Sequence, residues 1–282
     1  MPLTPETEAI IDRALAEDLQ GGDVTTSALI PDGLMGRARF VAEEGGVLAG
    51  LDVALAVFRR VNQDVETHVD LPEGAGIEPG VTIGSVVGQL SVILSAERTS
   101  LNFVRRLSGI ATETSRYVRE IEGYDARILD TRKTTPGLRT LEKQAVAAGG
   151  GVNHRRNLGD GVLIKDNHID ALRAQGATLA DVVRKARANA PHTLKIEVEV
   201  EDLAQVEEAL EAGADILLLD NMAISEMATA VGLAKGKALT EASGRMSLEN
   251  VREVAAAGVD LISVGALTHS SRALDIGLEL TG

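Results

Sequence analysis

The feature that most constrains the fold is a regular alternation that begins near Ala126 and continues almost to the end of the chain. Short apolar runs, each about as long as a buried strand, alternate with amphipathic helical stretches. The runs end at Asp130, Lys165, Glu199, Asp220, Glu241 and Gly265. Such successive β–α units predict parallel strands covered by helices, and an array of this kind closes naturally into a barrel. Only 2% of the residues are aromatic, so the core must consist of Ala, Val, Leu and Ile, as in buried parallel strands.

The first hundred residues have a different pattern, which predicts a separate domain of mixed helices and strands. The pattern indicates an amphipathic helix over 6–18, strands within 36–50 and 81–94, and a helix over 51–61 between them. A long helix follows from Ser95. Its apolar face carries Leu101, Val104, Leu107 and Ile110. We expect this helix to join the two domains.

Composition excludes several classes of partner. The net charge is −14 and the pI is about 4.8, a field that repels nucleic acid and anionic membrane surfaces. The chain has no cysteine, which excludes disulfides and thiolate metal sites. No basic N-terminal leader and no long apolar segment is present, so we expect a cytoplasmic location.

One segment reverses the charge of the rest of the chain. Residues 127–173 hold nine Lys or Arg against five acids, a net charge of +4, so the other residues together carry −18. A concave basic surface concentrates anions, and arginine binds carboxylate or phosphate through two hydrogen bonds at once. The cations expected on strand ends or the following loops are Arg132, Lys133, His154, Arg155 and Lys165. We predict that this set forms an anion-binding site and that the other cations are solvated.

Acidic and small residues follow other predicted strands. Glu199, Asp220 and Glu241 are each 21 residues apart, one β–α unit, so we expect them to lie side by side at the active end of the barrel. For any one of them, capping of the next helix is an equal alternative. EASGRM (241–246) and SVGALTHS (263–270) place small residues at strand ends before helices, which favours phosphate binding, although tight turns alone would explain them. Together these features predict a site for a phosphorylated sugar with Mg²⁺.

The longest motifs resemble one known family. DTRKTTPGLR (130–139), AVAAGGGVNHRRNLGDGVLIKDNHI (145–169), EVEVE, LLLDN and EASG resemble the quinolinate phosphoribosyltransferases, the nicotinate-nucleotide pyrophosphorylases that lose a carboxylate. The resemblance begins at EDLQGGDVTT (17–26) and runs nearly end to end. It implies an α/β fold with an N-terminal α/β sandwich domain over 1–108 and an incomplete βα (TIM-like) barrel over 109–282. The last C-terminal helix is expected to pack back on the first domain. The resemblance also implies a homodimer, able to assemble further, whose partner subunit completes each active site.

The resemblance implies transfer of phosphoribose from phosphoribosyl pyrophosphate to quinolinate, giving nicotinate mononucleotide, pyrophosphate and CO₂ in NAD biosynthesis. The residues implied for the two quinolinate carboxylates are Arg132, His154, Arg155 and Lys165, with Arg98 reaching across from the neighbouring subunit. Lys133 would face the pyrophosphate, Glu199 and Asp220 the ribose hydroxyls and Mg²⁺, and Ser243, Gly244, Gly265 and His269 the 5′-phosphate. These assignments make Lys133, Glu199 and Asp220 the catalytic set.

The resemblance leaves some points open. Arg245 stands where the family often has Gly or Asn, so the choice of Gly244 over its neighbours depends on where Arg245 points. No residue is implied as the proton source after decarboxylation. Three alternatives remain: a pyrophosphorylase-like protein of molybdenum transport operons, a barrel aldolase with Lys165 or Lys133 as Schiff-base amine, and a non-catalytic nucleotide-binding protein. The complete set of carboxylate-binding cations favours quinolinate.

Overall fold

The computed structural model describes residues 3–281, which form two compact units. The first contains the chain up to Ser115, Thr134–Gly150 and the chain from Leu267 onward, and the second contains Arg116–Lys133 and Gly151–Ala266. The predicted domain boundary between residues 108 and 109 falls within helix α4 (Leu90–Glu120) and stays a prediction. None of the helices in the described part of the chain is long and apolar enough to cross a membrane.

The first unit is built on an antiparallel sheet of four strands in the order β12-β1-β5-β3. The strands of the unit are β1 (Met35–Ala42), β2 (Gly46–Val47), β3 (Glu66–Val69), β4 (Gly76–Ile77), β5 (Thr82–Gln89) and β12 (Ile276–Leu280). Its helices are α1 (Pro5–Leu19), α2 (Val24–Leu29), α3 (Leu51–Val61) and α5 (Arg139–Ala148), together with most of α4. The α/β class predicted for this half is confirmed.

Local patterns predicted the first unit well, with two exceptions. The predicted face of α4 is buried: Leu101, Val104, Leu107 and Ile110 are at most 3% exposed. The strand predicted within 81–94 ends at Gln89, because α4 begins at Leu90, earlier than predicted. At the C-terminus, where the last helix is expected to pack back on this domain, residues 276–280 form an additional strand, β12, which pairs with β1. A strand can hydrogen-bond to a distant partner strand, and local periodicity does not reveal that partner.

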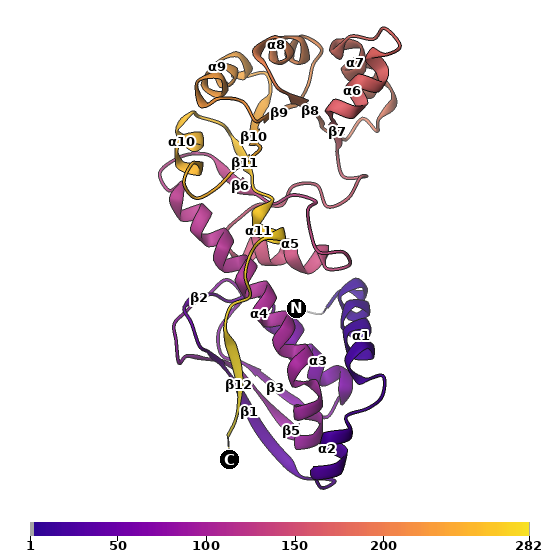
Figure 1. Cartoon of the computed structure of the whole chain (residues 1–282), viewed down its shortest axis with the longest axis vertical. Coiled ribbons are helices and arrows are strands. Elements are labelled where there is room, and N and C mark those ends of the chain that lie inside the picture. The colour runs from indigo at the N-terminus through magenta and orange to yellow at the C-terminus, as the bar shows by residue number, and fades with distance from the viewer. Residues whose placement is uncertain (1–2, 282) are drawn as a thin grey trace. The chain divides into compact units, whose positions relative to one another are not determined.

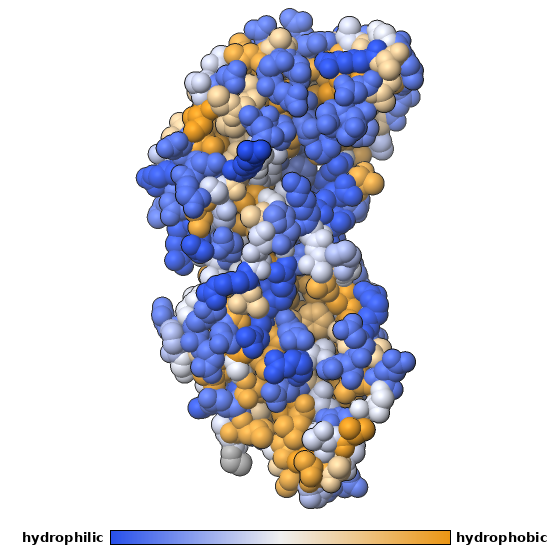
Figure 2. Space-filling model, viewed as in Figure 1, coloured by the Kyte–Doolittle hydropathy of each residue, from blue (hydrophilic) through white to orange (hydrophobic). Residues whose placement is uncertain are grey.

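Exposed apolar side chains gather at one end of the first unit. Most of the face in Figure 2 is hydrophilic, and hydrophobic residues concentrate around α2. There Val24 and Leu29 are 75% and 72% exposed, and Leu34 and Met35 of the following turn and strand are also exposed. Scattered apolar residues are normal on a surface, but a contiguous group suits contact with another protein.

The second unit is a six-stranded parallel sheet in the order β6-β11-β10-β9-β8-β7. Its strands are β6 (Arg127–Leu129), β7 (Val162–Ile164), β8 (Ile196–Val200), β9 (Ile216–Asp220), β10 (Leu239–Ser243) and β11 (Leu261–Ser263). The helices are α6 (Asp166–Arg173), α7 (Leu179–Asn189), α8 (Leu203–Glu211), α9 (Ile224–Ala234) and α10 (Val251–Ala256), and Figure 1 shows α8, α9 and α10 outside the arc of strands. The short α11 (Ala266–His269) follows β11, and from Leu267 onward it belongs to the first unit. All six predicted strands are therefore confirmed.

The barrel is incomplete, as the resemblance implied. Strands β6 and β7 lie at the two edges of the sheet and do not pair with each other. A bridge between Leu129 and Val152 occupies the free edge of β6 instead. The segment that follows Val152 is thereby held against the first strand, where it carries His154 and Arg155.

Helix starts in this unit follow local side-chain capping. Asp202 caps α8 by accepting a hydrogen bond from the Gln205 backbone N–H at 2.8 Å, as predicted. Helix α10 begins at Val251, so its predicted start at Ser247 is wrong. The Ser247 backbone N–H donates to Asn250 Oδ1 at 2.9 Å, which closes a turn before the helix.

The strand register separates the three acids that were expected to lie side by side. Glu199 and Glu241 both align with Leu218 of β9, whereas Asp220 aligns with Ser243, further along the strands. The expectation is wrong for Asp220. Equal spacing along the chain sets the repeat of the units, but hydrogen bonding between strands and the stagger of a barrel set the register.

Candidate active site

The second unit encloses a cavity of about 310 Å³ at the carboxyl ends of its strands. Its polar lining consists of Thr131, Arg132, Lys133, His154, Arg155, Lys165, Glu241, Ser243 and Ser263. All five predicted members of the basic cluster therefore meet in one wall, although they come from three separate loops and strand ends. Such a cavity in a protein of net charge −14 attracts anions locally.

A buried aspartate anchors the loop that carries His154. Asp130 has no exposed surface, and its Oδ1 accepts a hydrogen bond from the His154 backbone N–H at 2.8 Å. Thr131 Oγ1 accepts a hydrogen bond from the Lys133 backbone N–H at 3.0 Å. Because these bonds involve backbone groups, they position the basic side chains without using their charges.

The guanidinium groups of the cluster are close enough to oppose each other. Arg155 Nη1 donates to the Gly161 carbonyl at 3.0 Å. Burial, and secondly the charge of Arg132, lowers the pKa of Arg155. Arginine remains charged at neutral pH even so, which means that a bound anion would relieve the repulsion between the two groups.

An ion pair joins the cationic and acidic sides of the site. The Lys165 ammonium contacts the carboxylate of Glu199, which is 9% exposed at the end of β8. Asp220, at the end of the adjacent β9, accepts a hydrogen bond from the Asn221 side-chain amide at 2.8 Å. Two carboxylates on neighbouring strands offer the oxygen ligands that Mg²⁺ prefers, with substrate and water completing the coordination.

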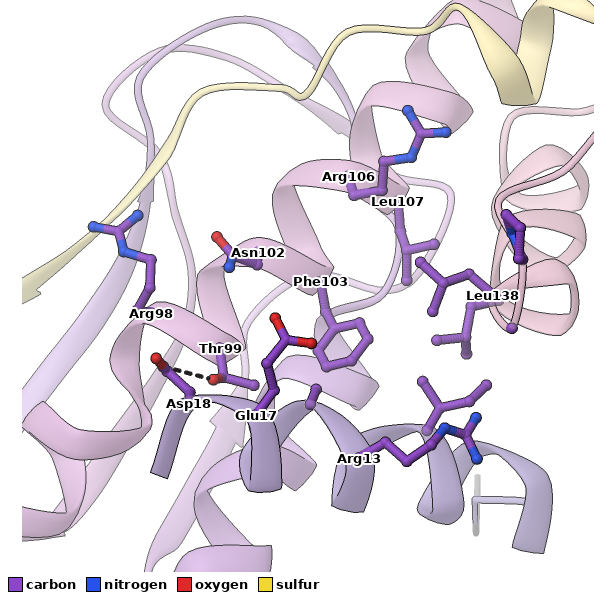
Figure 3. Close-up of a pocket in the computed structure, with 15 residues that line it drawn as sticks. Arg13, Glu17, Asp18, Arg98, Thr99, Asn102, Phe103, Arg106, Leu107 and Leu138 are labelled. Atoms are coloured by element: carbon purple, nitrogen blue, oxygen red, sulfur yellow. Dashed lines mark hydrogen bonds between the residues drawn. The ribbon is translucent and has the colours of Figure 1, made fainter. Parts of the chain in front are cut away.

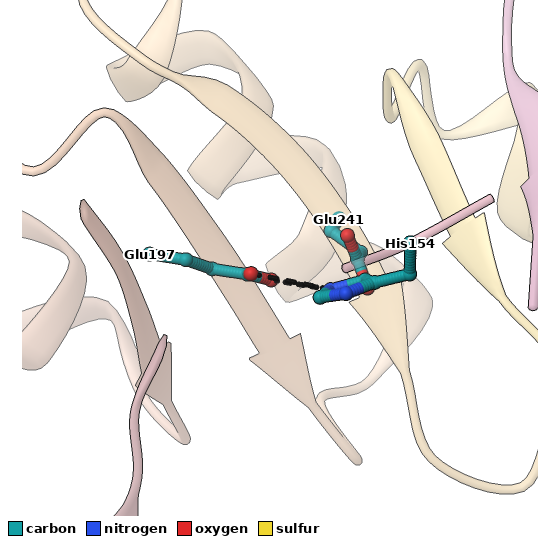
Figure 4. A group of neighbouring side chains, drawn as sticks. All are labelled: His154, Glu197 and Glu241. Atoms are coloured by element: carbon teal, nitrogen blue, oxygen red, sulfur yellow. Dashed lines mark hydrogen bonds and ion pairs between the residues drawn. The ribbon is translucent and has the colours of Figure 1, made fainter. Parts of the chain in front are cut away.

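His154, Glu197 and Glu241 form a second group, which we call the buried triad (Figure 4). His154 Nε2 lies 3.2 Å from Glu197 Oε2 and 3.5 Å from Glu241 Oε1. The backbone N–H of Arg155 donates to His154 Nδ1 at 2.7 Å, which assigns the ring proton to Nε2. Both ring nitrogens of His154 are thus engaged by the protein. The three ligand atoms lie within 4.8 Å of one another, a spacing that a small cation would also fit.

The triad holds an unusually weak acid. Burial raises the pKa of Glu241 to about 7, and the neighbouring Glu197 carboxylate is the second cause. The nearby His154 and the Ser263 hydroxyl act in the opposite direction. Glu241 therefore exchanges its proton near neutral pH.

Two members of the triad carried little weight in the sequence. In the sequence Glu241 is only one of three strand-end acids, and no predicted role falls on Glu197. The available signal was EVEVE (197–201), since side chains two residues apart in a strand share a face. In β8 this places Glu197 and Glu199 together on the interior face.

The loop after β10, which was predicted to bind phosphate, contains a position that requires glycine. Gly244 has φ +117°, and a Cβ there would lie 2.5 Å from Asn221 Oδ1. The Asn221 backbone N–H donates to the Ser243 carbonyl at 3.1 Å, which locks the two loops together. Ser243 lines the cavity, whereas Arg245 is exposed and its carbonyl accepts a hydrogen bond from the Asn250 amide. Gly265 lies two residues after the end of β11.

Two predicted site residues belong to the first unit. Arg98 is exposed and lines a different cavity of about 520 Å³, where Figure 3 shows it near Thr99 and Asn102 on α4. Thr99 Oγ1 donates to Asp18 Oδ2 at 3.1 Å on the opposite wall. His269 is exposed, with Nδ1 2.6 Å from Ser270 Oγ. The cavity of the second unit is lined without either residue.

Comparisons with known proteins agree with this fold. Residues 23–108 match the N-terminal domain model of quinolinate phosphoribosyl transferase, and residues 110–279 match its C-terminal domain model. A Mycobacterium leprae protein named nicotinate-nucleotide pyrophosphorylase (carboxylating) is 45% identical over 276 residues, which cover 96% of this chain and 95% of that protein. A Nicotiana tabacum protein named quinolinate phosphoribosyltransferase (decarboxylating) 1b is 39% identical over 293 residues, covering 98% and 83%.

Solved structures give the same result. The crystal structure of NadC from Streptococcus pyogenes matches with a TM-score of 0.95 and 38% identity, covering 100% of this chain and 99% of that one. The similarity thus extends through both units and includes the strands and loops that line the cavity. The chain belongs to the quinolinate phosphoribosyltransferase family.

Proposed function

We propose that the protein transfers phosphoribose from phosphoribosyl pyrophosphate to the ring nitrogen of quinolinate, and that the adduct loses CO₂. The products are nicotinate mononucleotide, pyrophosphate and CO₂, in a step of de novo NAD biosynthesis. The observation that carries this proposal is that the chain belongs to this family and that four Lys or Arg residues line the small cavity of its barrel. Quinolinate is a dianion, and a strongly acidic protein binds it only where cations are concentrated.

We assign the two quinolinate carboxylates to Arg132, Arg155 and Lys165. Their fixed positions would aim the ring nitrogen at the anomeric carbon of the sugar, which supplies much of the rate of a two-substrate reaction. His154 was expected to bind a carboxylate as well. Because both of its ring nitrogens already have protein partners, we assign it the role of shaping the cavity and positioning Arg155.

We assign phosphoribosyl pyrophosphate to the acidic and small residues at the strand ends. Glu199 and Asp220 would contact the ribose hydroxyls and Mg²⁺, and Lys133 the pyrophosphate. The 5′-phosphate would lie at Ser243, Gly244 and Gly265, and His269 stays a predicted contact. Bound Mg²⁺ would neutralise charge on the departing pyrophosphate. The carboxylates of Glu199 and Asp220 would stabilise positive charge that develops on the ribose.

We also propose a homodimer in which Arg98 serves the active site of the partner subunit. Arg98 is exposed on the first unit, and the exposed apolar group around α2 gives that unit a surface suited to a second copy of the chain. Arg98→Ala and Lys133→Ala proteins, each inactive, should regain activity when mixed, because hybrid dimers contain one intact site. Mixed dimers that form without regaining activity would exclude Arg98 from the partner's site. Assembly beyond the dimer and a cytoplasmic location stay predictions.

The direct test is an assay of the purified protein with quinolinate, phosphoribosyl pyrophosphate and Mg²⁺, with nicotinate mononucleotide measured by chromatography. We expect product from quinolinate and none from nicotinate, which lacks the second carboxylate. An absence of product would refute the proposed function. The aldolase alternative requires an uncharged lysine, and Lys165 is instead held in an ion pair with Glu199.

A further inference from the structure

Glu241 occupies an exceptional place in the cavity of the second unit. Among the described residues that line this cavity, it is the one acid, and four Lys or Arg residues line the same cavity. Its side chain is 1% exposed, and Oε1 has no hydrogen-bond partner among the described residues. A buried carboxyl oxygen without a hydrogen bond, here with His154 Nε2 3.5 Å away, is costly when the group is ionised and less so when it is protonated.

Glu241 also lines a second cavity, of about 520 Å³, on the other side of the triad. This cavity is lined by His154 and Glu197 and by the exposed residues Arg127, Asp160 and Lys195, so it reaches the protein surface. The carboxyl group of Glu241 therefore stands between the proposed substrate cavity and a route to solvent.

Burial and the neighbouring Glu197, against the effect of the nearby cations, favour the protonated form of Glu241. Glu197 faces it from β8, and His154 faces it from the loop before β7. The cations across the substrate cavity are Arg132, Lys133, Arg155 and Lys165. Burial and Glu197 raise the pKa of Glu241 to about 7 against the opposing effect of His154. A protonated Glu241 would not repel a dianionic substrate, whereas an ionised one would.

The proposed reaction needs a proton, and the following inference rests on that proposed function. Once the ring nitrogen carries the ribose, the bond from the adjacent carbon to its carboxylate breaks and CO₂ leaves. The electron pair stays on that carbon beside the positive nitrogen. We propose that Glu241 is the catalytic acid that protonates this carbon after CO₂ leaves.

Glu241 supplies the proton of this step, and the departing CO₂ leaves the electron pair that receives it. The O–H bond of Glu241 breaks, a C–H bond forms on the ring, and Glu241 remains as a carboxylate. Water in the second cavity then returns a proton to Glu241 before the next turnover. The other proton donors of the cavity suit this role less. His154 donates its ring proton to Glu197, and Lys165 is ion-paired with Glu199. Lys133 is assigned to the pyrophosphate, and arginine does not release a proton at neutral pH.

The test uses Glu241→Gln in the full-length protein, with Glu211→Gln on the exposed end of α8 as control. Glutamine copies the shape of the neutral acid but cannot donate a comparable proton. We expect kcat for nicotinate mononucleotide to fall by about 100-fold or more, the usual contribution of general acid catalysis. Quinolinate affinity, measured by calorimetry, should stay within about threefold of the wild-type value, since both side chains are neutral. In a single turnover of this variant, pyrophosphate and CO₂ should both be released ahead of nicotinate mononucleotide, because the blocked proton transfer follows the loss of CO₂.

The pH dependence of kcat tests the proposal even if the Glu241→Gln protein fails to fold or to bind quinolinate. In the wild-type protein, kcat should fall as the pH rises above about 7, because the acid is then ionised. A kcat that stays level from about pH 6 to 9 would overturn the proposal whatever the variant does. So would an unchanged kcat in a folded Glu241→Gln protein, or a stoichiometric divalent ion held by the triad. A wild-type protein that makes no nicotinate mononucleotide refutes the proposed function instead, so the two failures are distinguishable.

Discussion

Replacing Glu241 with glutamine should make the stability of the protein less sensitive to pH. The pKa of Glu241 is about 7 in the folded protein, against an ordinary value of 4.5 for a glutamate exposed to water. Below pH 4.5 both states bind the proton, and above pH 7 neither does. Between these values only the folded state keeps it, so wild-type stability falls as the pH rises through this window. A difference of about 2.5 pKa units corresponds to about 3 kcal/mol.

The measurement is urea unfolding of the wild-type and Glu241→Gln proteins near pH 4.5 and pH 8, followed by circular dichroism. Glutamine does not titrate, so from pH 4.5 to pH 8 the free energy of unfolding of the variant should rise by about 3 kcal/mol relative to that of the wild type. Glu211→Gln, at an exposed position, should show no such gain. If the free-energy difference between the Glu241→Gln and wild-type proteins were the same at both pH values, the burial of a protonated Glu241 would be refuted.

Three further perturbations test other parts of the structure. Gly244→Ala should lower the free energy of unfolding by about 1–3 kcal/mol, because φ is +117° and the new Cβ would collide with the Asn221 side chain. Thermal unfolding measures this loss, and an unchanged midpoint temperature would contradict the prediction. Arg106→Ala should lower the free energy of unfolding by about 3–5 kcal/mol, because it removes the 2.9 Å ion pair of Glu142, whose side chain is 0% exposed. Arg105→Ala breaks a more exposed ion pair and should lower the free energy of unfolding by less than about 1 kcal/mol. Comparable losses in the two arginine variants would refute that distinction. Chelation by EDTA should abolish turnover yet leave quinolinate binding intact by calorimetry, and turnover that survives exhaustive chelation would remove Mg²⁺ from the proposal.

Local physics explains why much of this protein was predictable from its sequence. Apolar runs identified all six strands of the barrel, because most side chains of a buried parallel strand are apolar. The cap of α8 was predictable because Asp202 and Gln205 are close in the chain. The basic cluster was identifiable for a related reason: loops that follow parallel strands converge at one end of a barrel, so residues at those positions meet whatever the details.

The sequence by itself therefore determined the repeating units, the acidic charge and the basic residues of the site. Tertiary structure alone decided the features that depend on partners distant in the chain. Strand β12 exists because it pairs with β1, and Arg39 and Glu279, 240 positions apart, form an ion pair across these strands. The register that separates Asp220 from Glu241 is set by hydrogen bonds between strands. The pKa of Glu241 is also a tertiary property, because desolvation and the approach of Glu197 arise only when the strands assemble and exclude water.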